Sequence, residues 1–157
     1  MKTAYIELNT TNQIYTLSSK RDNLSFTYKG FTVFPCVKVT SLAEILSKDY
    51  DYFVMDMSVL TTYLAREYAK CDFTFLVCSL SEWKMQSSLE KIEHLFQLTN
   101  LSQECVTILN NLGNKKSTNH IFSKRKLQVV SFPFIRNPFQ LQPKEFAIFA
   151  KLLERNI

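Results

Sequence analysis

Short apolar runs alternate with longer amphipathic segments along the chain. Runs typical of strands lie at residues 4–8, 26–28, 31–34, 52–56, 73–78, 106–109 and 127–132. Lys29-Gly30 separates the second run from the third, so these two form either a hairpin or one strand with an extended lead-in. Residues 52–55 are almost continuously apolar, which is typical of a parallel strand covered on both faces.

Apolar residues with helical spacing fill the gaps between these runs. We expect helices to begin at Ser41, near residue 59, at Ser81 and at Pro143. Ser41 and Glu44 have the spacing of a capping box. The side chains expected to face the core are Leu42, Ile45 and Leu46 in the first helix, Leu60, Tyr63, Leu64 and Tyr68 in the second, Met85, Leu89, Ile92, Leu95 and Phe96 in the third, and Phe146, Phe149, Ala150 and Leu153 in the last.

Strands that alternate with helices predict an α/β fold of three layers, with a mostly parallel sheet of about six strands and helices on both faces. One domain spanning residues 1–157 is expected for a chain of this length. Ligands of such sheets bind outside the carboxyl ends of the strands. The polar residues predicted at those ends are Asn9, Asp56, Ser58, Ser79, Ser81, Asn110 and Asn111.

The sequence holds two glycines, Gly30 and Gly113, and this count limits the chemistry. A loop that wraps phosphates needs residues at positive φ or a backbone that touches the pyrophosphate, and glycine provides both. Neither GxxxxGK[ST] nor GxGxxG can be written with these two positions. The sequence therefore predicts no hydrolysis of nucleotides, no catalytic residues and no cofactor, and ATP or ADP with magnesium is not expected to bind.

The cysteines and histidines are too scattered for a structural zinc site, so we predict no metal. No apolar run approaches the length of a membrane span, and the start of the chain turns polar too early for a signal peptide, so a cytoplasmic protein is expected. The net charge of +5 allows contact with DNA or an anionic membrane surface, although a solvated loop is the simpler interpretation of the basic stretch. That stretch comprises Lys115, Lys116, Lys124, Arg125 and Lys126.

Five short motifs resemble the ParA/MinD-like group of deviant Walker ATPases, which belong to the P-loop proteins. They lie at Glu7–Asn12, Tyr50–Asp56, Cys71–Leu80, Val106–Asn110 and Phe132-Pro133. The first is similar to the acidic D-L-D-x-x-x-N segment of the family, and the second to its Y-D-Y strand ending in aspartate. The likeness extends from residue 3 to the C-terminus, although these motifs alone carry it.

The resemblance implies that Asp56 matches an aspartate near the magnesium and that Asn110 matches an asparagine that contacts adenine. Family members begin with a strand and a phosphate-binding loop, and this sequence begins after the matching point. Asn9 replaces the second acid of the D-L-D segment, and Met57 and Ser58 replace the prolines after the strand-end aspartate. The resemblance therefore implies a degenerate relative or a truncated copy, a pseudo-ATPase in which Asp56 and Asn110 are remnants of a site.

In the family the missing strand lies between those that match residues 52–56 and 73–78. If these two strands pair directly, the strand order becomes 2-1-3-4-5-6, as in flavodoxin-like folds. The alternatives are two open strand edges, or a strand supplied by a partner.

The leading hypothesis is a non-catalytic adaptor that acts in protein interaction or localisation, with a protein partner or as a homodimer. A receiver-like signalling domain is an alternative, with Asp56 as phospho-acceptor and Ser79 beside it. A nucleotide-binding domain completed in trans by a partner with the phosphate loop is another. Simpler roles also fit, since Asp56 would serve as a cap and Asn110 as a turn residue. Trp83 is either a partner contact or a side chain packed at the sheet rim.

Overall fold

The computed structural model describes residues 1–9, 13–17, 24–57, 61–99, 106–112, 122, 127–133, 135 and 142–154. The chain divides into two compact units, Met1–Leu64 and Ala65–Ile157. Both units combine strands with helices, so the predicted α/β class is confirmed. Among the described residues, no helix is long and apolar enough to cross a bilayer.

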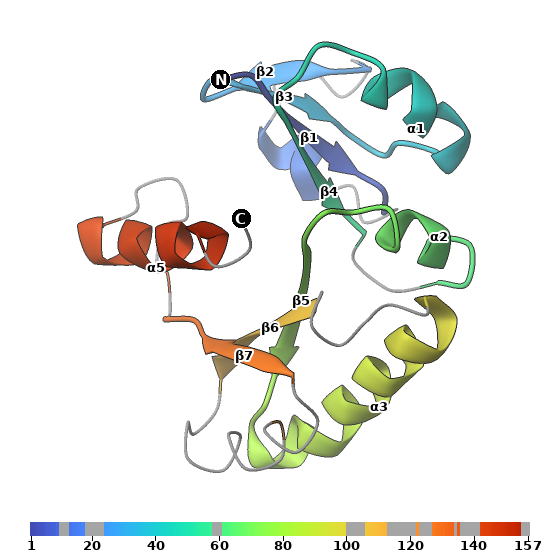
Figure 1. Cartoon of the computed structure of the whole chain (residues 1–157). Helices are drawn as coiled ribbons and strands as arrows, with labels where there is room; N and C mark the ends of the chain where they lie inside the picture. Colours follow the sequence, from blue (N-terminus) through green and yellow to red (C-terminus); the bar gives the residue numbers. More distant parts are fainter. Residues whose placement is uncertain are drawn as a thin grey trace. The chain divides into compact units, whose positions relative to one another are not determined.

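The first unit is built on a mixed sheet of four strands with the order β2-β3-β1-β4 (Figure 1). Its strands are β1 (Thr3–Glu7), β2 (Phe26–Tyr28), β3 (Phe31–Phe34) and β4 (Tyr52–Asp56). β1 lies between β3 and β4 and is parallel to both. Ala4 and Ile6 are fully buried because they belong to this central strand.

β2 and β3 form the hairpin that the sequence offered as one of two interpretations. Lys29 and Gly30, the two loop residues, have φ values of 45° and 92°. Positive φ at both positions is the signature of the type I′ turn, whose twist matches that of the strands it joins. Tyr28 and Phe31 flank this turn as a register pair, and their rings meet edge to face with centroids 5.9 Å apart.

Helix α1 (Val39–Leu46) follows the hairpin and buries Leu42 and Ile45, as predicted, whereas Leu46, the third side chain expected to face the core, is exposed. The predicted capping box is wrong. The N-cap is Lys38, three residues before the expected cap Ser41, and its side chain makes no capping hydrogen bond, while Ser41 already lies in the first turn. The described part of this unit also contains a 3-10 helix, η1 (Gln13–Leu17), between β1 and β2.

The second unit contains a parallel sheet of three strands with the order β5-β6-β7. These are β5 (Thr74–Ser79), β6 (Val106–Leu112) and β7 (Gln128–Ser131). β6 runs past the expected end at residue 109, so Asn110 is a strand residue and not part of a turn. Register pairing continues through Asn110 on both of its sides, with Cys78 and with Ser131.

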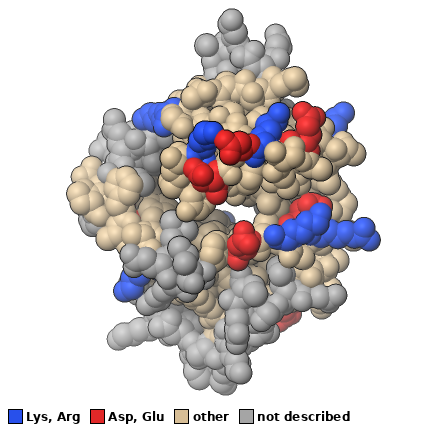
Figure 2. All heavy atoms as spheres, turned by 45° about the horizontal axis from the view of Figure 1, so that its top comes forward, with Lys and Arg blue, Asp and Glu red and all other residues tan. Residues whose placement is uncertain are grey.

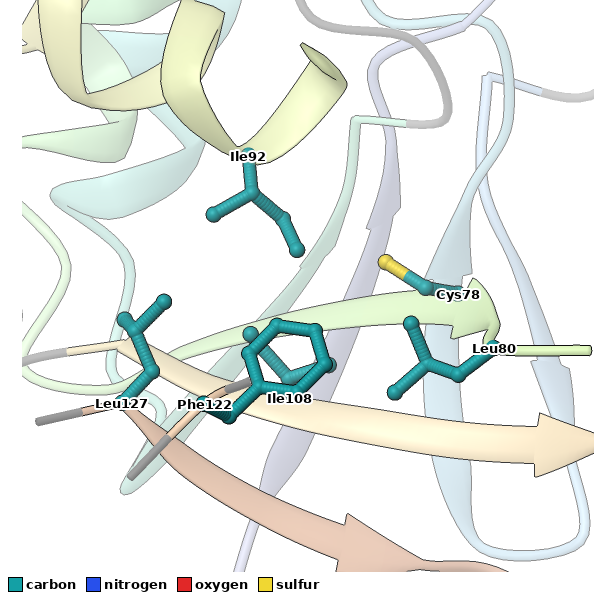
Figure 3. Close-up of a cluster of buried hydrophobic side chains, with 6 residues drawn as sticks. All are labelled: Cys78, Leu80, Ile92, Ile108, Phe122 and Leu127. Atoms are coloured by element: carbon teal, nitrogen blue, oxygen red, sulfur yellow. The ribbon is translucent and has the colours of Figure 1, made fainter. Parts of the chain in front are cut away.

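Helix α3 (Glu82–Thr99) packs on this sheet and contributes side chains to the core of the unit (Figure 3). The cluster comprises Cys78, Leu80, Ile92, Ile108, Phe122 and Leu127, with Leu76, Met85, Leu89, Phe96 and Val129 packed against it. Four of the five side chains expected on the buried face of this helix belong to the cluster, and the fifth, Leu95, is also buried. The expectation for this helix is therefore confirmed.

Two further helices among the described residues of this unit differ from expectation. α2 (Ala65–Tyr68) is a single turn, shorter than the helix predicted over residues 59–70, of which 59 and 60 lie outside the described residues. Tyr63, which was expected to face the core, is exposed. α5 (Pro143–Glu154) begins at Pro143 as predicted. It buries Glu145 and Leu152, while Phe146 is 59% exposed and Ala150 is exposed as well, so the predicted buried face of this helix is wrong at both positions.

The predicted strand order holds within each sheet but not across the chain. Strands 2, 1 and 3 of the prediction are β3, β1 and β4, and strands 4, 5 and 6 are β5, β6 and β7. The described strands form two sheets and not one sheet of six, because β4 and β5 are each the outer strand of their own sheet. A single domain over residues 1–157 stays a prediction.

Candidate functional site

The carboxyl ends of β1, β3 and β4 meet at one edge of the first sheet, because these strands are parallel. Glu7 ends β1 and pairs in register with Asp56, the last residue of β4. The two carboxylates thus occupy neighbouring positions where ligands of parallel sheets bind. We call the group formed by Tyr5, Glu7, Cys36 and Asp56 the edge cluster.

Glu7 is the most enclosed member of the edge cluster, with 2% of its surface exposed. Its Oε2 accepts hydrogen bonds from the backbone N–H of Cys36 (3.2 Å) and from the Cys36 thiol (3.4 Å). Its Oε1 accepts one from the backbone N–H of Ile14 in η1 (3.4 Å). Buried carboxylates need such donors, because an unpaired charge out of water is strongly destabilising. Glu7 therefore ties β1 both to η1 and to the segment that follows β3.

Cys36 reaches Glu7 through an unusual backbone conformation. Its φ is 49°, in the left-handed region that residues other than glycine seldom occupy. This turn directs both the N–H and the thiol of Cys36 to the same carboxylate oxygen. The next residue, Val37, donates its N–H to the carbonyl of Glu7 (2.8 Å), which fixes the segment after β3 against the end of β1.

Asp56 accepts a hydrogen bond of 2.8 Å from the phenol of Tyr5 through its Oδ2. Tyr5 lies two residues before Glu7 on β1, so both side chains are on the same face of the sheet. Burial, and then the hydrogen bond to Asp56, raise the pKa of the Tyr5 phenol well above its ordinary value. Tyr5 therefore stays protonated and remains a donor to Asp56 at neutral pH.

The predicted site residues divide between the two sheets. Asn9 is half-buried just beyond the end of β1, and Asp56 is in the edge cluster. Ser58 lies outside the described residues. Ser79 and Asn110 belong to the second sheet, so the structure does not place them in the edge cluster.

Asn110 holds the carboxyl end of the second sheet together. Only 2% of it is exposed, and its Oδ1 accepts the backbone N–H of Leu80 (3.2 Å). Its carbonyl accepts the N–H of Phe132 (2.7 Å). The side-chain oxygen of Asn110 therefore links β6 to the residue after β5, a structural contact that accounts for its burial.

Ser79, the last residue of β5, and Ser81, the residue before α3, lie in the connection between these two elements. The hydroxyl oxygens of Ser79 and Ser81 lie 3.2 Å apart, and Lys84 donates its N–H to the carbonyl of Ser81 (2.9 Å). The carbonyl of Ser79 accepts a hydrogen bond from the buried hydroxyl of Ser88 (2.8 Å), the seventh residue of α3. These bonds orient α3 against β5.

In the part of the chain that the structure describes, no group of three His, Cys, Asp or Glu side chains has a metal-binding arrangement.

Burial raises the pKa of the Cys71 and Cys78 thiols, so both stay protonated at neutral pH.

Charges of both signs are mixed on the described surface. Figure 2 shows Lys and Arg side chains beside Asp and Glu side chains on the face that it presents. Three such pairs are Lys2 with Asp49, Lys48 with Glu44 and Lys70 with Glu67. All residues of the basic stretch lie outside the described residues, namely Lys115, Lys116, Lys124, Arg125 and Lys126.

No protein-family model matches this chain, and no curated protein matches it.

The structure adds two residues to the site that the sequence did not single out, Tyr5 and Cys36. The period of two along β1 was the signal for Tyr5, because it places Tyr5 and Glu7 on one face. No local signal pointed to Cys36, since its contact with Glu7 spans 29 positions.

Proposed function

We propose that this chain is a non-catalytic protein-interaction domain, a pseudo-ATPase related to the ParA/MinD-like ATPases. The observation that carries the proposal is the bonding of the polar residues at the carboxyl ends of the strands. Glu7 accepts donors from Cys36 and Ile14, Asp56 accepts the phenol of Tyr5, and Asn110 accepts Leu80. Side chains used in this way hold the fold together, and they do not have the arrangement of a cluster kept ready for magnesium and phosphate.

The glycine positions support the same conclusion. Gly30 lies in the hairpin turn at the amino end of β3, at the opposite edge of the sheet from Glu7 and Asp56. Gly113, the second of the two glycines in the sequence, lies outside the described residues. The backbone conformations needed to cradle a triphosphate at the edge cluster would have to come from other residues, at a cost in strain.

Exposed aromatic side chains support a role in protein interaction. Trp83, on the first turn of α3, is 87% exposed, and Phe146 on α5 is exposed as well. Tryptophan is enriched among the residues that dominate binding energies at interfaces. Since Trp83 is the single tryptophan of the sequence, its fluorescence reports directly on whether this surface becomes covered.

The proposal is tested by measuring phosphate release from ATP and magnesium. We expect no turnover above the buffer rate from the wild-type chain. The matched variants are Asp56→Ala and Asp72→Ala, the second removing an exposed carboxylate outside the edge cluster. Magnesium-dependent turnover that Asp56→Ala abolishes and Asp72→Ala leaves intact would overturn the proposal.

A further inference from the structure

β4 has one side without a strand partner among the described residues. The N–H of Tyr52 donates to the carbonyl of Lys2 (3.3 Å), and the carbonyl of Asp56 accepts the N–H of Leu8 (2.8 Å). Backbone groups alternate in direction along a strand, so those of Phe53 and Met55 point away from β1. This edge therefore presents two donors and two acceptors in the spacing that another strand requires.

The side chains of β4 are also open on one face, so the prediction of a strand covered on both faces is wrong. Tyr52 is 56% exposed and Val54 is 50% exposed, and both lie on the face of the sheet that carries Asp56. Phe53 lies on the other face, where its ring packs edge to face on that of Tyr50 with centroids 5.7 Å apart. An outer strand with exposed apolar side chains readily accepts a further strand.

We propose that β4 pairs antiparallel with β4 of a second copy of this chain, about a twofold axis through Val54. Phe53 of each copy then faces Met55 of the other, and each such pair exchanges two backbone hydrogen bonds. Between these two pairs, Val54 of one copy lies opposite Val54 of the other, in a pair without backbone hydrogen bonds, where side chains approach most closely. A twofold axis closes the assembly at two chains, because the same edge is used by both.

The order of polar and apolar residues along β4 selects the second copy and the antiparallel direction. In this register Tyr52 of one copy lies opposite Asp56 of the other, which places a phenol donor against a carboxylate, a group that accepts several hydrogen bonds. A parallel pairing in register would instead set Phe53 against Phe53 and Met55 against Met55. Residues whose backbone groups both point across the gap exchange hydrogen bonds only when the strands run antiparallel, so two copies of this edge pair in register only in that direction.

This inference deepens the proposed function and rests on it, since it names a partner for the interaction domain. A pair of five-residue strands is a small contact, so we expect a reversible dimer that dissociates on dilution.

The test is sedimentation velocity over a concentration series of the full chain. Val54→Lys places two lysines directly opposite each other, with Cβ atoms about 5 Å apart, and we expect the repulsion of their ammonium groups to weaken dimerisation on the order of 5-fold to 200-fold. Val54→Glu should have the same effect. Because the opposed charges then attract, an equal mixture of the two variants should recover association. Thr27→Lys adds the same charge to β2 at the other edge of the sheet and should leave the dimer unchanged.

Three results would overturn the inference: a wild-type chain that stays monomeric throughout the series, a Val54→Lys variant that dimerises like wild type, or a mixture that shows no recovery. The recovery arm separates loss of the interface from loss of the fold, because misfolded variants do not regain association on mixing. Each of these results leaves the proposed function standing if ATP turnover is absent. Magnesium-dependent turnover would overturn the proposed function whether or not the chain dimerises.

Discussion

Replacing Glu7 by alanine tests whether the edge cluster holds the fold. The substitution removes the acceptor for the N–H and the thiol of Cys36 and for the N–H of Ile14. A hydrogen bond to a charged group contributes about 1.5–3 kcal/mol, and the Cys36 N–H makes the best of the three. The thiol is a weak donor and the Ile14 contact is long, so these two add little.

We therefore expect Glu7→Ala to lower the free energy of unfolding by about 2–3 kcal/mol. Glu7→Gln keeps one side-chain oxygen as an acceptor for Cys36 and should cost roughly half as much. Urea denaturation measures both variants, through a lower midpoint with an unchanged slope.

Glu44→Ala is the matched control, because Glu44 is an exposed acid of the same unit whose side chain is 79% accessible. Surface substitutions of this kind change stability by less than about 0.5 kcal/mol. If Glu7→Ala and Glu44→Ala shift the urea midpoint equally, the edge carboxylate does not hold the fold and the reasoning fails.

Two further predictions concern Tyr5 and Gly30. The raised pKa of the Tyr5 phenol means that this group keeps its proton in the folded state at a pH where it loses it in the unfolded state, so the free energy of unfolding should fall as pH rises above about 10. Tyr5→Phe should lower the free energy of unfolding at neutral pH by about 1 kcal/mol and remove part of that alkaline loss. Urea midpoints between pH 7 and 11 check this, and parallel pH curves for both proteins would refute it. Gly30→Ala should destabilise by about 1 kcal/mol, because φ is 92° although no atom lies within 4 Å of the added methyl group; equal midpoints would contradict this.

Local patterns predicted the elements of the fold and failed on how those elements meet. The run at 52–56 and the helix that begins after Ser81 lie where the spacing of apolar residues placed them. Ser41 had the spacing of a cap, yet the helix starts before it, since a capping signal cannot show how the preceding chain enters the helix. On α5 the helical stripe ran through Phe146, while Leu152 is the residue that the structure buries.

The site was predictable in place but not in its connections. Asp56 falls at a carboxyl end because the strand pattern ends there. The burial of Glu7 depends on Cys36, which the chain brings back from 29 residues away, and no periodicity encodes such a contact. Asn110 was read as a turn residue because asparagine favours turns, but pairing with β5 and β7 carries the strand through it.

The central claim is that Glu7 and Asp56 stabilise the fold and do not seat a nucleotide, and thermal unfolding with excess ATP and magnesium tests it most directly. A site filled at 100 times its dissociation constant would add about 2.7 kcal/mol to the free energy of unfolding. We predict that the unfolding midpoint stays at its value without ligand. An upward shift that grows with ATP concentration in the wild type and is absent in Asp56→Ala would contradict the claim.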